Sequence, residues 1–133
     1  FGWIQDTVSV ISIRFSVVPS MLLDLVRELE EITLVDGARP LIVSHPGHGV
    51  IQAVWIIGSE TESREAMSRM IRETRQATFT RGGNVVIERC PFEVKADVDV
   101  WGNSDGSVHV MRRLKEQYDP NRILNPGRFV GAI

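Results

Sequence analysis

Two stretches of helical periodicity in this chain each lie between stretches in which apolar and polar residues alternate. From Val8 to Val17 the apolar side chains fall on every second position, which is typical of a strand with one buried face. Further strands are predicted at residues 40–44, 50–57 and 84–90, where short apolar runs are bounded by glycine or proline. One helix is predicted after the first strand and another before the last.

The order strand, helix, strand, strand, helix, strand limits the folds that the chain can adopt. It is the split βαβ, or ferredoxin-like, arrangement (β-α-β-β-α-β), an antiparallel four-stranded sheet with both helices on one face. We therefore predict an α+β fold in a single domain, with a ferredoxin-like core at residues 6–91 and a C-terminal helix and tail at residues 92–133. Residues 92–101 alternate acidic and apolar side chains and are expected to be extended.

The predicted helices have recognisable ends. The first begins near Pro19-Ser20 and is closed by Asp36-Gly37, whereas Ser59–Glu62 has the spacing of a capping box that opens the second. The apolar stripe of the second helix consists of Ala66, Met67, Met70, Ile71 and Thr74. Its remaining residues are expected to form a solvated face: Arg64, Glu65, Arg69, Arg72, Glu73 and Arg75.

The other face of the predicted sheet carries polar side chains. Ser12 and Arg14 point away from the helices in the first strand, as Gln52 does in the third and Glu88 in the fourth. An uncovered sheet face normally contacts another domain, a second copy or a ligand. Arg14 could bind a carboxylate through two hydrogen bonds, or it could lie solvated on a wet surface, and the sequence leaves both open.

Composition and motifs exclude several classes of function. The 133 residues carry a net charge of −2, which gives no electrostatic reason to propose nucleic acid as a partner. Cys90 is the single cysteine and has no activating group nearby, so it is interpreted as a small buried hydrophobe. The sequence contains no glycine-rich phosphate loop, no Gly-x-Ser-x-Gly motif and no apolar run near the ~20 residues that span a bilayer. No catalytic residue is assigned.

The histidines do not indicate a metal site. His45 and His48 stand three apart, as metal ligands sometimes do, but they fall in a turn rich in proline and glycine without a further ligand nearby. They are interpreted as hairpin-turn residues. His109 lies off the apolar stripe of the last predicted helix and is expected at the surface.

The last stretch of the chain places two proline-bearing turns around one apolar pair. Apolar spacing over 108–114 predicts a helix that reaches Tyr118, and Asp119-Pro120 should end it because the residue before proline is disfavoured in the α region. Asn125-Pro126-Gly127 is predicted to form a tight turn in which proline fixes φ and glycine takes a positive φ. With Ile123-Leu124 between the turns, the pattern indicates an ordered tail.

In two segments the sequence resembles FAD-linked oxidases of the vanillyl-alcohol oxidase type, and among them the E-subunit group of the glycolate oxidases. Lys115, Tyr118-Asp119-Pro120 and Asn125-Pro126-Gly127-Arg128 occur in the order and spacing of that family's C-terminal signature. Residues 81–91 are similar to a Gly-Gly strand segment of the same group.

The resemblance implies a cap domain that covers the reactive face of FAD, a cofactor held mainly by an N-terminal domain. It also implies oxidation of a small 2-hydroxy acid such as glycolate to the 2-oxo acid, with hydride transfer to the flavin. Asn125-Pro126-Gly127-Arg128 would then contact the cofactor, and Arg14 and Gln52 are the candidates on the substrate side. By itself the chain is expected to be inactive.

The resemblance further implies partners. They are the protein's own N-terminal FAD-binding domain and the flavin and iron–sulfur subunits of a glycolate oxidase. A cytoplasmic location is expected, and a peripheral position at the inner membrane face remains open. The chain begins at Phe1 without an initiator Met, so we expect it to be a piece of a longer protein.

One alternative follows from the order of strands and helices alone. A stand-alone ferredoxin-like module could bind a small ligand or dimerise through its open sheet, although the tail signature does not favour it. Under the cap-domain hypothesis, the tail should be mobile or docked on a substitute surface. A tail packed into the domain's own core would contradict that hypothesis.

Overall fold

The computed structural model describes residues 9–34, 37–58, 63–102 and 106–133. The chain divides into two compact units, Phe1–Gly102 and Asn103–Ile133, which we call the sheet unit and the tail unit. The predicted division into a core at residues 6–91 and a C-terminal helix and tail at residues 92–133 stays a prediction.

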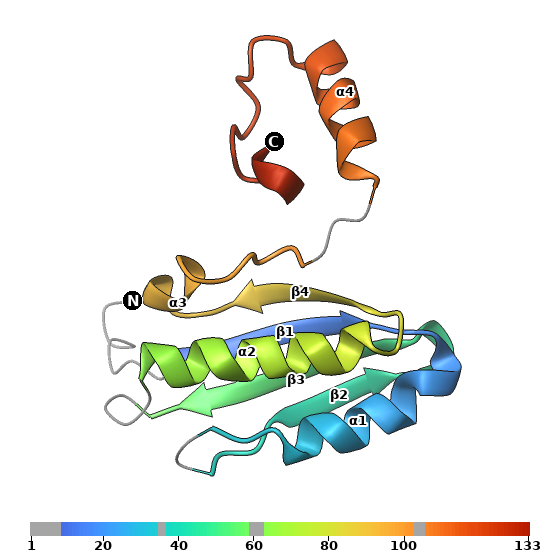
Figure 1. The fold of residues 1–133 in the computed structure, drawn as a ribbon, viewed down its shortest axis with the longest axis vertical. Helices are drawn as coiled ribbons and strands as arrows, with labels where there is room; N and C mark the ends of the chain where they lie inside the picture. The colour runs from blue at the N-terminus through green and yellow to red at the C-terminus, as the bar shows by residue number, and fades with distance from the viewer. Residues whose placement is uncertain (1–8, 35–36, 59–62, 103–105) are drawn as a thin grey trace, which may run out of the picture. The chain divides into compact units, whose positions relative to one another are not determined.

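The sheet unit is built on four strands: β1 Ser9–Ser16, β2 Leu41–His45, β3 Val50–Ile57 and β4 Asn84–Arg89. Their order in the sheet is β2-β3-β1-β4, and each neighbouring pair is antiparallel (Figure 1). The predicted ferredoxin-like arrangement is confirmed, and the observed strands lie within one residue of the predicted bounds.

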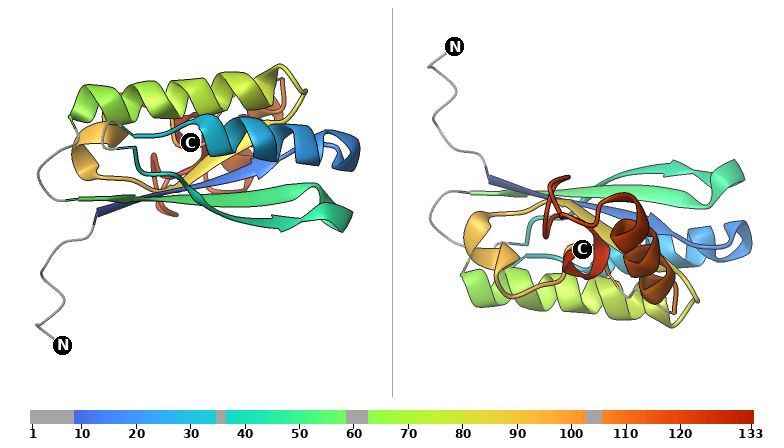
Figure 2. Two further views of the ribbon diagram at one scale, coloured as in Figure 1. Left: turned by 90° about the horizontal axis from the view of Figure 1, so that it is seen from below. Right: turned by 90° about the horizontal axis from the view of Figure 1, so that it is seen from above.

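The two long helices of the sheet unit pack on one face of the sheet (Figure 2). α1, Leu22–Glu31, follows a 3-10 turn at Pro19–Met21 (η1), where proline supplies a helical φ at the first position. α2, Arg64–Phe79, begins after Ser63, whose Oγ accepts a hydrogen bond from the Ala66 N–H at 3.1 Å.

The apolar core lies between these helices and the sheet. Ile13 and Phe15 of β1 and Trp55 of β3 are fully buried against it. The indole Nε1 of Trp55 donates to the carbonyl of Ile32 at 3.1 Å, so burial leaves this polar atom satisfied. All five residues of the predicted α2 stripe are buried, which confirms that prediction.

The predicted end of the first helix and the predicted start of the second helix both differ from the observed ones. α1 ends at Glu31, and Gly37, at φ +79°, belongs to a separate turn that its N–H closes on the Leu34 carbonyl. Asp36 and the predicted capping box at Ser59–Glu62 lie outside the described residues. The N-cap residue of α2 is Ser63. Ser59 also has a hydroxyl oxygen that could cap a helix, and sequence spacing alone does not distinguish the two serines.

The prediction that residues 92–101 are extended is wrong. Phe92–Lys95 forms one helical turn, α3, which buries Val94 completely. Beyond it, the carbonyl of Val100 accepts a hydrogen bond from the Ile87 N–H at 2.8 Å, so this segment covers the outer edge of β4. A single turn is too short for its periodicity to be recognised.

The arginine-bearing face of α2 was predicted to be solvated. Most of its residues are exposed, but two of its arginines also bind the segment that follows α3. Arg64 forms an ion pair with Asp97, and Arg75 donates to the carbonyl of Asp99. Both arginines therefore fasten residues 96–101 to the helix.

The tail unit consists of α4, Val108–Tyr118, a series of turns and a 3-10 turn at Val130–Ala132 (η3). The predicted helix end at Tyr118 is confirmed: the Asp119 N–H donates to the Lys115 carbonyl at 2.8 Å and leaves the helical conformation at φ −138°. No described residue of this unit belongs to the buried apolar core. None of the described helices is long and apolar enough to cross a membrane.

Two isoleucines of β3 provide a test of this one-sided packing. Ile51 is fully buried toward the helices, whereas Ile56 lies on the opposite face with 49% of its surface exposed. We predict that Ile51→Ala lowers the free energy of unfolding by about 2–5 kcal/mol, because it leaves a cavity. Ile56→Ala should cost less than about 1 kcal/mol. Urea denaturation measures both, and equal losses would contradict an open sheet face.

Candidate functional site

The tail unit is organised around one buried carboxylate. Asp119 is 5% exposed, and no other described residue of this unit is as buried. Its Oδ2 lies 2.6 Å from the ammonium of Lys115, one helical turn earlier. Its two oxygens also accept hydrogen bonds from the backbone N–H groups of Ile123 and Leu124, each at 3.0 Å. Asp119 thus ties the end of α4 to the turn that follows it.

These contacts explain how a carboxylate is tolerated at this position. The hydrogen bond from Lys115 holds the pKa of Asp119 below its usual value, and the N–H groups of Leu124 and Ile123 act in the same direction against the effect of burial. Lys115 also donates to the carbonyl of Leu124. The sequence signal for this arrangement is a lysine four residues before an aspartate at a helix end. Sequence reasoning did not assign it a role.

The predicted turn at Asn125-Pro126-Gly127 is confirmed. The Arg128 N–H donates to the Asn125 carbonyl at 3.3 Å, and Gly127 has φ +71°, as expected for a type II turn with proline at its second position. All four residues of the predicted cofactor-binding segment are exposed. Apart from Gly127 itself and its two neighbours in the chain, no described residue has an atom within 4 Å of the place where a Cβ on Gly127 would stand, so the backbone at this turn is open to an approaching ligand.

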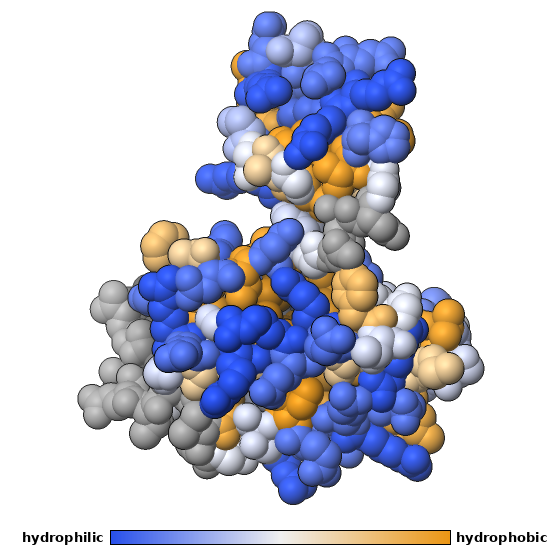
Figure 3. Space-filling model, viewed as in Figure 1, coloured by the Kyte–Doolittle hydropathy of each residue, from blue (hydrophilic) through white to orange (hydrophobic). Residues whose placement is uncertain are grey.

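Next to this turn the tail unit presents an uncovered apolar surface. A cavity of about 480 Å³ opens between α4 and the tail, and Leu114, Tyr118, Leu124 and Phe129 are among the residues that line it. Tyr118 is 78% exposed and Leu124 62%, and apolar atoms are visible on this unit in Figure 3. Apolar residues that fill no core of their own mark a surface for another protein part.

The open face of the sheet brings the two substrate-side candidates together. Strand register places Arg14 opposite Gln52. Glu88 of β4 joins them: its Oε1 lies 3.4 Å from the Arg14 Nε, and its Oε2 accepts a hydrogen bond from the Gln52 Nε2 at 2.8 Å. The sequence placed Glu88 on this face, but it did not predict that Glu88 organises the other two.

This arrangement leaves complementary groups available. Because Glu88 uses the Nε side of Arg14, the two terminal guanidinium nitrogens have no partner among the described residues. Gln52 must donate to the carboxylate, so its carbonyl oxygen remains an acceptor. The face therefore offers cationic donors beside a neutral acceptor.

The histidines and the cysteine, all within the described residues, are not grouped into a site. His45 ends β2 and His48 lies in the 3-10 turn Pro46–His48 (η2), which confirms their interpretation as hairpin-turn residues. Within the described ranges no group of three or more possible ligands could hold a metal ion. His109 is exposed, as predicted, with Nδ1 at the Gly106 carbonyl. Burial against the core raises the pKa of the Cys90 thiol, which keeps it protonated.

A ferredoxin-like sheet with one open face, and a tail unit with an uncovered apolar surface, define a domain that works against another domain. Comparison with protein families identifies the family to which such a domain belongs. The model for the C-terminal domain of FAD linked oxidases matches residues 4–129, and the chain belongs to this family. No curated protein and no solved structure matches the chain. The chain is thus part of an FAD-linked oxidoreductase, in which this domain pairs with an N-terminal FAD-binding domain.

The structure predicts how Asp119 titrates. Its pKa is depressed, so its contribution to the order of the tail is complete above the ordinary aspartate value and is lost as the pH falls through the lower folded-state value. NMR titration should show the amide resonances of Ile123 and Leu124 shifting with a midpoint below 3.8, the unperturbed value. Asp119→Asn should abolish this titration and speed amide exchange over 119–125. A midpoint at or above 3.8 would contradict the arrangement.

Proposed function

We propose that this domain forms the cap over the flavin of an oxidase or dehydrogenase that converts a small 2-hydroxy acid, such as glycolate, to the 2-oxo acid. The observation that carries the proposal is the grouping of Arg14, Gln52 and Glu88 on the open sheet face. Family membership supplies the flavin chemistry, and the sheet face supplies the complementarity to this substrate class.

The available groups on the sheet fit the two functional groups of a 2-hydroxy acid. The terminal nitrogens of Arg14 can hold the carboxylate through two parallel hydrogen bonds. The carbonyl oxygen of Gln52 can accept a hydrogen bond from the substrate hydroxyl. Glu88 fixes both side chains and excludes a second anion from their inner edge, which favours a monocarboxylate over a dicarboxylate at this position.

The residues of the tail fit a contact with the edge of FAD rather than a complete FAD site. Within the described ranges no glycine-rich loop precedes a helix start in the way that phosphate-binding loops do. The exposed Asn125 amide and Arg128 guanidinium, with the open backbone at Gly127, can supply polar contacts to a cofactor held mainly by the N-terminal domain. When bound, FAD supplies the hydride acceptor, while this domain binds and orients the substrate.

The uncovered apolar surface of the tail unit supports docking on that N-terminal domain. Leu114, Tyr118 and Phe129 would be covered there, which accounts for their exposure in this chain. A complex with the flavin and iron–sulfur subunits of a glycolate oxidase would pass electrons onward, and a cytoplasmic position at the inner membrane face suits such a complex. A stand-alone ligand-binding or dimerisation module would leave the tail signature without a role.

The proposal is tested on the gene product that includes the residues preceding Phe1. We expect a yellow protein with bound FAD, in which glycolate perturbs the flavin spectrum under anaerobic conditions. Arg14→Met should weaken glycolate binding about tenfold or more, since a hydrogen bond to a charged group contributes roughly 1.5–3 kcal/mol. Arg27→Met, on the exposed side of α1, is the matched control and should bind normally.

Two outcomes would count against the proposal. A colourless protein that takes up no FAD would remove the flavin function. A yellow protein in which Arg14→Met and Arg27→Met bind glycolate equally well would remove the role of the sheet face.

A further inference from the structure

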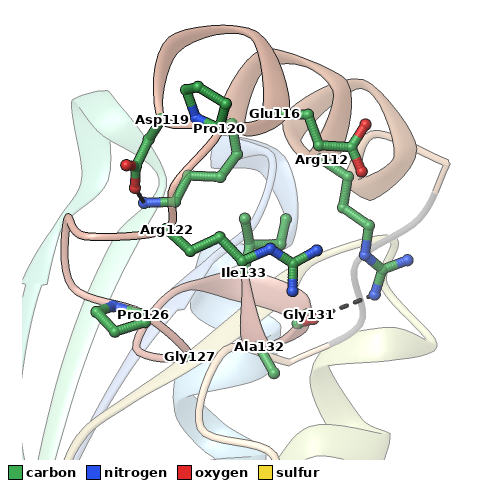
Figure 4. A pocket seen from close by; sticks show the side chains of 11 residues that line it. Arg112, Glu116, Asp119, Pro120, Arg122, Pro126, Gly127, Gly131, Ala132 and Ile133 are labelled. Carbon is green, nitrogen blue, oxygen red and sulfur yellow. Dashed lines mark hydrogen bonds and ion pairs between the residues drawn. The ribbon is translucent and has the colours of Figure 1, made fainter.

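A second cavity of the tail unit, of about 430 Å³, lies between α4 and the turns that follow it (Figure 4). It differs in chemistry from the apolar cavity, because five charged side chains lie in its wall beside proline, glycine and aliphatic residues. The charged residues are Arg112, Lys115, Glu116, Asp119 and Arg122. The volume is within the roughly 300–1,000 Å³ typical of small-molecule sites.

The side-chain charges in this wall do not balance. Lys115 and Asp119 neutralise each other at 2.6 Å. Arg112 and Arg122 then face a single remaining side-chain carboxylate, Glu116, so the side chains of the wall carry one excess positive charge, which the α-carboxylate of Ile133 balances in the 133-residue chain. Within the described part of the chain, neither arginine forms an ion pair.

The two guanidinium groups come from different segments and reach the same space. Arg112 projects from α4, and its Nη2 donates to the carbonyl of Gly131 at 3.1 Å, which leaves its other N–H groups available. Arg122 projects from the turn after the helix, and its side chain extends across the cavity in Figure 4.

The backbone at Arg122 has a conformation that determines which substitution can test its side chain. Arg122 has φ +52°, in the left-handed region where a non-glycine residue is strained. Its N–H closes a turn on the Asp119 carbonyl at 3.0 Å, so the conformation belongs to the fold of the tail. Glycine would adopt it without strain, so Arg122→Gly removes the guanidinium group without disfavouring the turn.

We propose that this cavity binds a phosphoryl group. One arginine suffices to satisfy a carboxylate through two parallel hydrogen bonds. Two arginines from separate segments suit a group with three oxygens and up to two negative charges. The proposal depends neither on the sheet face nor on the 2-hydroxy acid, although Pro126 and Gly127 of the proposed cofactor-contact turn also line this cavity.

The test is calorimetric titration of the 133-residue chain with inorganic pyrophosphate. We expect saturable binding that Arg122→Gly and Arg112→Gln each weaken about tenfold or more, as expected for loss of a charged hydrogen-bond donor. Arg122→Gly also relieves the positive φ, so its thermal midpoint should not fall. A loss of binding with an unchanged or higher midpoint therefore reports the guanidinium rather than the fold.

Arg113→Gln is the matched control, because Arg113 is exposed on the same helix and does not line the cavity. It should bind pyrophosphate as the unchanged chain does. Titrations with ADP and with FAD separate two sources of the phosphoryl group: affinities equal to that of pyrophosphate support a free phosphate compound, and tighter binding supports a nucleotide.

Three results would overturn the proposal. They are the absence of saturable binding, equal weakening by Arg113→Gln and Arg122→Gly, and acetate binding as tightly as pyrophosphate. The second would indicate general charge attraction, and the third a carboxylate site.

Discussion

Burial of one face of the sheet against α1 and α2 is the constraint from which the rest of the sheet unit follows. The strand β1 points three apolar side chains toward the helices: Ile11, Ile13 and Phe15. Because side chains alternate along a strand, Arg14 points to the opposite face of the sheet. Register with β3 places it opposite Gln52. A slip of one residue would move every apolar side chain out of the core, so the positions of the polar groups are as firmly determined as the core itself.

The tail unit is held together differently. Among its described residues a carboxylate is the most buried side chain, and it is satisfied by one ammonium group and two backbone N–H groups. A buried ion pair is costly unless every polar atom is satisfied, and it contributes more to a defined geometry than to stability. Here it determines where the chain turns after α4. Because polar contacts order the tail, its apolar side chains stay exposed.

Strong periodicity made most of the fold predictable. The four strands, the α2 stripe, the end of α4 at Tyr118 and the Asn125-Pro126-Gly127 turn all follow from local spacing or from proline and glycine. Two features could not be predicted in this way. The single turn α3 has only one buried residue, a valine, and the start of α2 has two serines that could each cap the helix. Side-chain contacts between segments far apart in the sequence could not be predicted either. Glu88 meets Arg14 across a pairing whose register shifts between Ser12 and Ile13, and sequence alternation cannot show such an irregularity.

Positive φ angles in the tail fall on residue types that differ in how well they tolerate this conformation. Gly127 and Asn125 occupy this region, and both residue types tolerate it, so their presence is explained by the chain reversal alone. Arg122 and Ala132 occupy the same region without that tolerance. The turn closed by the Arg122 N–H on the Asp119 carbonyl uses this conformation, so the positive φ by itself does not indicate a ligand. Arg122 differs from Ala132 in the charge that it carries into the cavity.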